Sequence, residues 1–350
     1  MGYRLWVTGY GESMKKGLGI LVLAGMLMGC QHASRYWKDE AQAEPQHVEI
    51  VRFDNAILGM KDDVRGTKEK IEALYAQYPE FMPLWVEDIL GVPTEDTAFL
   101  VQNLPLLVQD TLYVPKREQE LFADISDLQG TLDKAFTRLK YVDPELRVPT
   151  IYWFISGYNN RLYFNGDIIG VGADMYLGSD FPIYDMIATV YSYQKQTMRK
   201  ECIPVDILNE YLYRNMPYTS NQERLLDLMI YHGKIRYLTA QILDDYPEYE
   251  VMGWTKEQWD WCEANEEGIW HHMMDQKHVF SMDHMVQTNY LKEGPFTLEI
   301  SQEYCPGQVG IWIGWQIVAS YMEQNEDVTL LELMTEGDAQ KVLDKSYYRP

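Results

Sequence analysis

The order of strand-like and helix-like segments limits this chain to one fold class. Short β-branched or aromatic runs occur at 47–53 and between 150 and 172, where Gly157 and the pair Asn165–Gly166 mark turns. Beyond Pro182, nearly every segment repeats its apolar residues at the helical period. Strands therefore come early and helices late, without regular alternation of strand and helix. The sequence predicts a predominantly helical α+β domain with a small antiparallel sheet.

The expected helices follow from apolar spacing and from the positions of proline. In the first half of the chain they cover 67–78 and 117–141, and the second of these carries a continuous apolar stripe. Beyond Pro182 the expected helices are 184–200, 203–215, 221–243, 255–276, 281–291, 308–323, 328–334 and 337–345.

Two glycines inside one expected helix require a packing reason. Gly310 and Gly314 are four residues apart, and a glycine inside a helix costs about 1 kcal/mol relative to alanine. Trp312, Trp315 and Tyr321 lie nearby and supply large apolar area. We therefore expect a neighbouring helix to approach this one closely within the core.

The first thirty residues have the organisation of an exported lipoprotein. A basic segment at 14–16 precedes the uncharged, apolar run 17–28. This run has about a dozen residues, whereas a membrane-spanning helix needs roughly twenty. It ends in Leu-Met-Gly-Cys at 27–30, which resembles a bacterial lipobox, where cleavage precedes a cysteine that becomes acylated. We expect a signal peptide at 1–29 and a lipid on Cys30.

The expected lipid fixes the location of the rest of the chain. We place the true start at Met14, so that residues 1–13 lie upstream of it. Two or three acyl chains, at about 0.8 kcal/mol per buried methylene, give on the order of 20–35 kcal/mol of membrane affinity. We expect a polar tether at 30–46 and one globular domain at 47–350, in the periplasm or at the cell surface. Gln31 after the cysteine favours the outer membrane over the inner.

The net charge excludes one class of partner, and the number of cysteines limits the disulfide bonds that the chain can form. The chain carries a formal net charge of −23, which repels nucleic acid and excludes it as a partner. Besides Cys30 the chain has Cys202, Cys262 and Cys305. Three cysteines argue against a disulfide framework but leave room for one bridge.

One group of residues has the spacing of a zinc-peptidase site but not its chemistry. Asn209 and Tyr213 lie four apart on the expected helix 203–215, and His232 follows in the next helix. This layout resembles that of gluzincin metallopeptidases, in which the first two positions are histidines and the third is a glutamate. Glu210 occupies the position of the general base. Because zinc prefers imidazole, carboxylate or thiolate ligands, we expect no metal and no other cofactor.

Several interpretations of these features remain open. Asn209, Tyr213 and His232 are either the degenerate site of a former peptidase or ordinary packing residues of two helices. An alternative is a zinc-dependent hydrolase with atypical ligands, in which Glu210 acts as the base and His232 as one ligand. A third possibility is a surface lipoprotein that binds glycans or peptides through exposed tryptophan and tyrosine side chains, for which Trp254, Trp259 and Trp261 are the candidates.

Longer motifs in the C-terminal third resemble one protein family. They lie at 253–266, 269–270, 294–296, 306–322 and 343–350, and the segments 48–54 and 229–234 belong to the same pattern. Together with the lipobox they are similar to the gliding motility lipoprotein GldB family. The resemblance implies an envelope lipoprotein of a motility and secretion machinery, with other envelope proteins as partners. Our hypothesis is a non-catalytic scaffold built on a gluzincin-like framework, with its oligomeric state left open.

Overall fold

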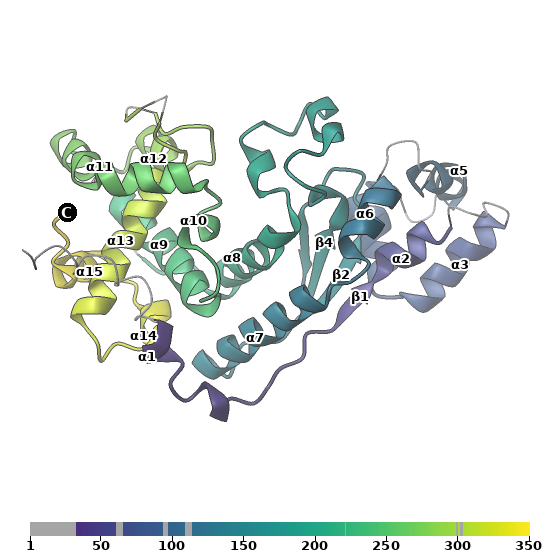
Figure 1. Cartoon of the computed structure of the whole chain (residues 1–350), viewed down its shortest axis with the longest axis horizontal. Helices are drawn as coiled ribbons and strands as arrows, with labels where there is room; N and C mark the ends of the chain where they lie inside the picture. The colour runs from purple at the N-terminus through teal and green to yellow at the C-terminus, as the bar shows by residue number, and fades with distance from the viewer. Residues whose placement is uncertain are drawn as a thin grey trace, which may run out of the picture.

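The computed structural model describes residues 33–60, 66–93, 97–108, 114–220, 222–298, 300–301 and 304–350. Two lobes are apparent in Figure 1, a sheet lobe formed by the first half of the chain and a helical lobe formed by the second half. The expected signal peptide at 1–29, the start at Met14 and the lipidation site Cys30 lie outside the described residues. Within the described ranges, no helix is long and apolar enough to cross a bilayer.

A four-stranded mixed sheet forms the centre of the first lobe. Its strands are β1 (Ile50–Arg52), β2 (Thr150–Phe154), β3 (Leu162–Asn165) and β4 (Ile168–Gly172), in the spatial order β1-β2-β4-β3. β2 pairs in parallel with both β1 and β4, and only β3 and β4 are antiparallel. The α+β class is confirmed, but the prediction of an antiparallel sheet is wrong for two of the three pairings. The Asn165–Gly166 turn places β3 outside β4, so that buried β4 returns beside β2 in the same direction.

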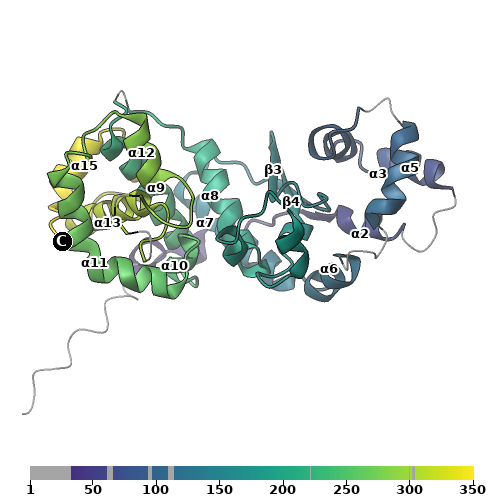
Figure 2. The same cartoon turned by 90° about the horizontal axis from the view of Figure 1, so that it is seen from above.

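Alternate side chains of β2 face two different cores. Tyr152 and Phe154 pack into a cluster with Phe81, while Ile151 and Trp153 belong to the larger core that continues into the helical lobe. The helices around the sheet are α2 (Phe53–Leu58), α3 (Thr67–Gln77), α4 (Phe81–Leu84), α5 (Thr97–Val108), α6 (Val114–Phe122) and α7 (Ser126–Val142). Figure 2 shows α3 and α5 at the end of the molecule farthest from the helical lobe.

One expected helix of the first lobe is interrupted in the structure. The segment 117–141 is divided between α6 and α7 instead of forming one helix. Oδ1 of Asp124 accepts a hydrogen bond from the backbone N–H of Ser126 at 2.9 Å. This interaction satisfies an N–H group at the start of α7, so a new helix begins there.

The second lobe consists of helices around a central pair. They are α8 (Ile203–Asn215), α9 (Leu225–Ile242), α10 (Glu248–Val251), α11 (Lys256–Asp275), α12 (His284–Leu291), α13 (Val309–Gln324), α14 (Leu330–Thr335) and α15 (Ala339–Ser346). Each of them overlaps a predicted helical segment except α10, which lies between the predicted helices 221–243 and 255–276. The prediction of a helix at 184–200 is wrong, because this segment has only 3-10 turns, at 182–186, 194–197 and 200–202. Met186 and Tyr191 in this segment are exposed, so no apolar face stabilises a longer helix.

The close helix crossing predicted from the glycines is confirmed. A Cβ atom built on Gly314 of α13 would lie 1.9 Å from the backbone oxygen of Met229 in α9. A Cβ on Gly233 of α9 would lie 2.3 Å from the carbonyl carbon of Gly314. Trp312 and Trp315 are buried beside this contact. The backbones of α9 and α13 therefore touch directly, which only glycine at these positions allows.

The segment expected to be a tether is docked onto the folded body. Trp37 is buried, and its indole N–H donates to the backbone oxygen of Gln241 at 2.8 Å. The Arg138 guanidinium lies over the Trp37 ring and also pairs with Glu40 at 2.7 Å. Arg35 also donates to the backbone oxygen of Met322 at 3.0 Å, so the described part of the segment 30–46 contacts the folded body.

Candidate functional site

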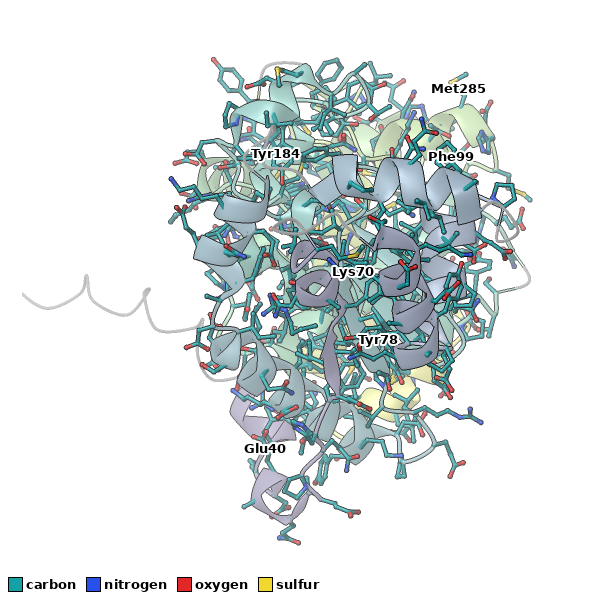
Figure 3. All side chains as sticks on the ribbon, turned by 90° about the vertical axis from the view of Figure 1, so that its right-hand side faces the viewer. Glu40, Lys70, Tyr78, Phe99, Tyr184 and Met285 are labelled. Atoms are coloured by element: carbon teal, nitrogen blue, oxygen red, sulfur yellow. The ribbon has the colours of Figure 1, made fainter. Side chains whose placement is uncertain are left out.

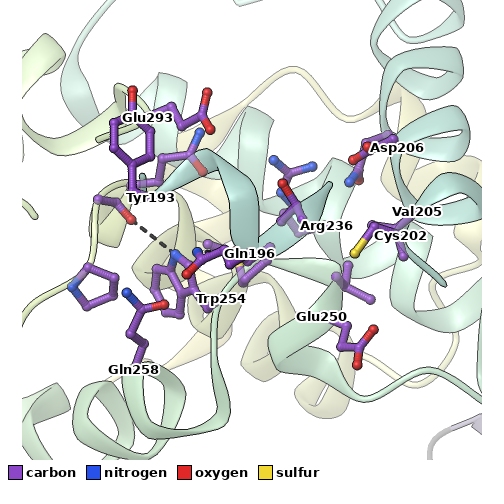
Figure 4. A pocket seen from close by; sticks show the side chains of 18 of the residues that line it. Tyr193, Gln196, Cys202, Val205, Asp206, Arg236, Glu250, Trp254, Gln258 and Glu293 are labelled. Carbon is purple, nitrogen blue, oxygen red and sulfur yellow. Dashed lines mark hydrogen bonds between the residues drawn. The ribbon is translucent and has the colours of Figure 1, made fainter. Parts of the chain in front are cut away.

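A cleft runs along α8, where the sheet lobe meets the helical lobe. It consists of a cavity of about 210 Å³, shown in Figure 4, and a second one of about 480 Å³. The smaller cavity lies between the segment before α8 and the residues that follow α10, and the larger one lies beside the edge strand β3. Both are lined by Arg161, Asp206, Asn209 and Arg236. These four shared residues place the two cavities side by side, and we call the two together the cleft.

The helix α8 is fixed in the cleft by polar contacts with α9. Oδ1 of Asn209 accepts a hydrogen bond from the Thr239 hydroxyl at 2.9 Å. One turn further along α8, the Tyr213 hydroxyl lies 2.8 Å from Nδ1 of His232. The two contacts show that α8 and α9 run antiparallel. They also show that Tyr213 and His232 come together, whereas Asn209 is engaged with a residue of α9 that the spacing did not indicate.

His232 and Tyr213 form a neutral pair. Burial, together with the nearby Arg236 cation, lowers the pKa of His232 to about 4. Burial also raises the pKa of Tyr213 above its ordinary value. At neutral pH the Tyr213 hydroxyl therefore keeps its proton and the His232 ring is neutral, so the two groups share one hydrogen bond in which the tautomer of His232 sets the donor.

Glu210, the residue at the position of the general base, is paired with a neighbouring arginine on its own helix. Its carboxylate forms an ion pair with Nε of Arg214 at 3.1 Å, and it lines the larger cavity. His232 is not among the described residues that line either cavity. The side chain that would activate a nucleophile and the one good metal ligand therefore do not face a common space.

The donor set at these positions does not fit zinc. Asn209 and Tyr213 offer an amide and a protonated phenol, neither of which is a good zinc ligand. Nδ1 of His232 is engaged in a hydrogen bond with the Tyr213 hydroxyl, and the Arg236 cation nearby opposes a second positive charge. In the described part of the chain, no group of three or more histidine, cysteine, aspartate or glutamate residues is placed to hold a metal.

This donor set leads to a direct prediction about metal content. Full-length protein in detergent, incubated with micromolar zinc and passed through gel filtration, is expected to carry far less than one zinc per chain by elemental analysis. Stoichiometric zinc that disappears in the His232→Ala variant would contradict the prediction and support the hydrolase alternative.

Two arginines of the cleft were not found from the sequence. Arg161 pairs with Asp206 at 2.5 Å and donates to the Thr197 hydroxyl at 3.0 Å. Arg236 forms no ion pair or hydrogen bond with any other described residue, and its Nε atom is buried without a partner. A signal for Arg236 was present in the sequence, because it follows His232 by four residues and so shares its helix face.

The tryptophans proposed for ligand binding are mostly part of the core. Trp254 and Trp259 are 6% and 7% exposed, and Trp261 is half-buried. The indole N–H of Trp254 donates to the backbone oxygen of Gly307 at 3.2 Å, a contact drawn in Figure 4. The aromatic glycan-binding surface therefore loses most of its support.

Fold and cleft together define a predominantly helical α+β protein whose inter-lobe cleft carries arginine and amide groups in place of a metal-binding set. The family model for gliding motility protein GldB matches residues 34–350, so the chain belongs to that family. This confirms the resemblance noted in the C-terminal motifs. No curated protein and no solved structure matches the chain.

Proposed function

We propose that this protein is a non-catalytic, lipid-anchored component of a cell-envelope gliding machinery, where it acts by contacting other envelope proteins. The observation that carries this proposal is the family match over 34–350, which spans both lobes and the cleft between them. The chemistry of the cleft supports a non-catalytic role. Tyr213 and His232 satisfy each other, and Glu210 is paired with Arg214. A hydrolase has less support, because it would need these groups to be available.

The docked N-terminal segment gives the anchor a geometric role. If Cys30 is acylated, six residues lie between it and Trp37, a span of roughly 25 Å at most. Figure 3 shows Glu40, which belongs to this docked segment, at the opposite end of the view from Tyr184. Tyr184 belongs to the segment before α8, in which Tyr193, Gln196 and Thr197 line the cleft. We infer that the anchor holds the body close to the membrane with this loop directed away from it, toward partners.

Deleting the gene tests the motility role. In a gliding host, the deletion strain is expected to lose surface spreading and directed single-cell movement, because one part of the envelope machinery is missing. The measurement is colony spreading together with time-lapse microscopy. Intact gliding and intact protein secretion in the deletion strain would count against the proposal.

A complementation series separates the anchor from the body. Wild-type protein is expected to restore gliding, whereas the Cys30→Ser variant is expected to accumulate unlipidated and to restore it poorly. Mass spectrometry of the native protein should show an acylated N-terminal Cys30. An unmodified, unprocessed N-terminus would remove the anchor from the proposal while leaving the family membership intact.

A further inference from the structure

We propose that the cleft along α8 binds the carboxylate of an extended peptide segment from a partner protein, with Arg236 as the recognising group. This inference rests on the proposed function, because it names how an envelope partner would be held. Three observations carry it: an unpaired cation in the cleft, an unused amide beside the cation, and an edge strand along the larger cavity.

The first observation is the charge balance of the cleft. Arg161 is neutralised by Asp206, and Arg214 is neutralised by Glu210. Arg236 lines both cavities and has no carboxylate partner within the described ranges. A partly buried guanidinium without a counter-ion is costly, so an incoming anion gains a strong, charge-assisted contact here.

Acidic residues along the rim do not remove this excess positive charge. Glu250 lines the smaller cavity, but Arg199 pairs with it at 3.1 Å. Glu293 also lines that cavity, at an exposed position where water screens its charge. Figure 4 shows Arg236 between the side of the cavity that carries Asp206 and the side that carries Trp254. Its guanidinium is therefore the cation that a ligand in the cleft meets.

The second observation concerns Asn209, which lines both cavities together with Arg236. Its carbonyl oxygen accepts the Thr239 hydroxyl, so its amide N–H groups are left without a partner among the described residues. A guanidinium and an amide in one cleft present donors only. They complement a group that only accepts hydrogen bonds, and a carboxylate is such a group.

The third observation indicates that the carboxylate belongs to an extended peptide. β3 is the last strand in the sheet order, so one of its edges pairs with no other described strand. Its residues Leu162, Tyr163 and Phe164 line the larger cavity, opposite α8. An extended segment can add to such an edge through backbone hydrogen bonds. Cavities of about 480 and 210 Å³ suit a few extended residues rather than a folded domain.

The test uses full-length protein in detergent, immobilised and exposed to two pools of random octapeptides without aspartate or glutamate. The pools differ only at the C-terminus, which is a free carboxylate in one and an amide in the other. Quantitative mass spectrometry measures the retained fraction. The free-carboxylate pool is expected to be retained about tenfold better, as a charge-assisted contact requires.

Matched variants assign the effect to Arg236. Arg236→Gln is expected to lower retention of the free-carboxylate pool about tenfold, and Arg236→Lys by less, because lysine keeps the charge but loses the planar fork. Arg349→Gln makes the same change at an exposed position outside the cleft and should leave retention unchanged. Circular dichroism of each variant establishes that it is folded. If Arg236→Gln does not fold, the role of Arg236 is tested by comparing Arg236→Lys with the wild type, and lower retention by the lysine variant is the expected result.

Several results would overturn the inference. Equal retention of the two pools would show that the site does not recognise the carboxylate. Full retention by a folded Arg236→Gln variant would show that Arg236 is not the recognising group. If millimolar acetate displaces the peptides completely and they bind no better than acetate, the site takes a small anion and the peptide claim fails.

Gliding assays separate this inference from the proposed function. If the deletion strain stops gliding while the Arg236→Gln strain glides normally and no peptide is retained, the inference fails and the motility role stands. If peptides are retained through Arg236 but the deletion strain glides normally, the binding site stands and the motility role fails.

Discussion

Replacing Gly314 with alanine is expected to lower the free energy of unfolding by at least about 3 kcal/mol, a large share of the stability of an ordinary domain. The new methyl group would lie 1.9 Å from the Met229 oxygen and 2.4 Å from its carbonyl carbon. These are backbone atoms of α9, so no side-chain rotation relieves the clash. The two central helices must separate, which opens the core around Trp312 and Trp315. Urea unfolding of the full-length protein, followed by circular dichroism, measures the loss.

The chain offers a matched control for this substitution. Gly268 lies inside α11, is exposed, and would bring its new Cβ within 4 Å of no atom outside its own helix backbone and chain neighbours. Gly268→Ala should therefore leave stability unchanged or raise it by about 0.5–1 kcal/mol through helix propensity. The same chemical change then has opposite effects at two helical sites. Equal stability of the two variants would show that the α9–α13 crossing tolerates a side chain.

Helices of the second lobe could be predicted well because their signals are local. The apolar period and Pro204 at the first turn of α8 each act within a few residues. Strand pairing depends instead on segments far apart in the sequence. No local pattern shows that β1 pairs in parallel with β2, about one hundred residues later. The prediction of an antiparallel sheet assumed that every pair of strands is antiparallel, as β3 and β4 are across their tight turn.

Tertiary contacts determine the structure of two further segments for which the local sequence pattern was misleading. The segment 184–200 has helical spacing, but its exposed Met186 and Tyr191 face no core. The segment expected as a tether, 30–46, is polar on average, yet one aromatic side chain in it, Trp37, docks onto the body through a hydrogen bond and a cation–π contact. Average polarity cannot reveal such an anchor, because its partners Gln241 and Arg138 are distant in the sequence.

The candidate site was located in part from spacing alone. Spacing brought Tyr213 and His232 to one interface, as the structure shows. It did not place Thr239 against Asn209, nor did it find Arg236, which defines the charge of the cleft. A sequence cannot show that a cation lacks a partner, because this depends on where all the neighbouring carboxylates lie in the folded protein. The proposal of a former peptidase framework stays a prediction, whereas the arginine-lined cleft is an observed feature.

A second large effect is expected from a buried cluster in the sheet lobe. Glu118 of α6 and Asp54 of α2 are both fully buried, and Arg52 contacts them at 3.2 and 2.6 Å. One guanidinium cannot neutralise two carboxylates. Burial, together with the adjacent Asp54, raises the pKa of Glu118 to about 9. At neutral pH Glu118 therefore keeps its proton, while Arg52 pairs with Asp54.

This raised pKa makes stability depend on pH with a defined sign. Between the unfolded pKa near 4.5 and the folded pKa near 9, the folded state binds one more proton than the unfolded state. Stability is therefore fully present below about pH 4.5 and is lost as the pH rises toward 9. The Glu118→Gln variant keeps a neutral donor in the same shape but cannot titrate. We expect it to match the wild type near pH 5 and to exceed its stability by a few kcal/mol, on the order given by linkage, at pH 9.

The measurement is the free energy of unfolding of both proteins at pH 5, 7 and 9. Glu120→Gln serves as the control on the same helix, because its side chain is half exposed and its ion pairs with Lys116 and Arg117 are long, at 4.0 and 3.8 Å. Such surface pairs contribute little, so this variant should follow the wild-type pH dependence. The decisive comparison is the pH slope. If Glu118→Gln loses stability toward pH 9 as steeply as the wild type, then Glu118 is not the group that holds the extra proton, and the two carboxylates share Arg52 in ionised form.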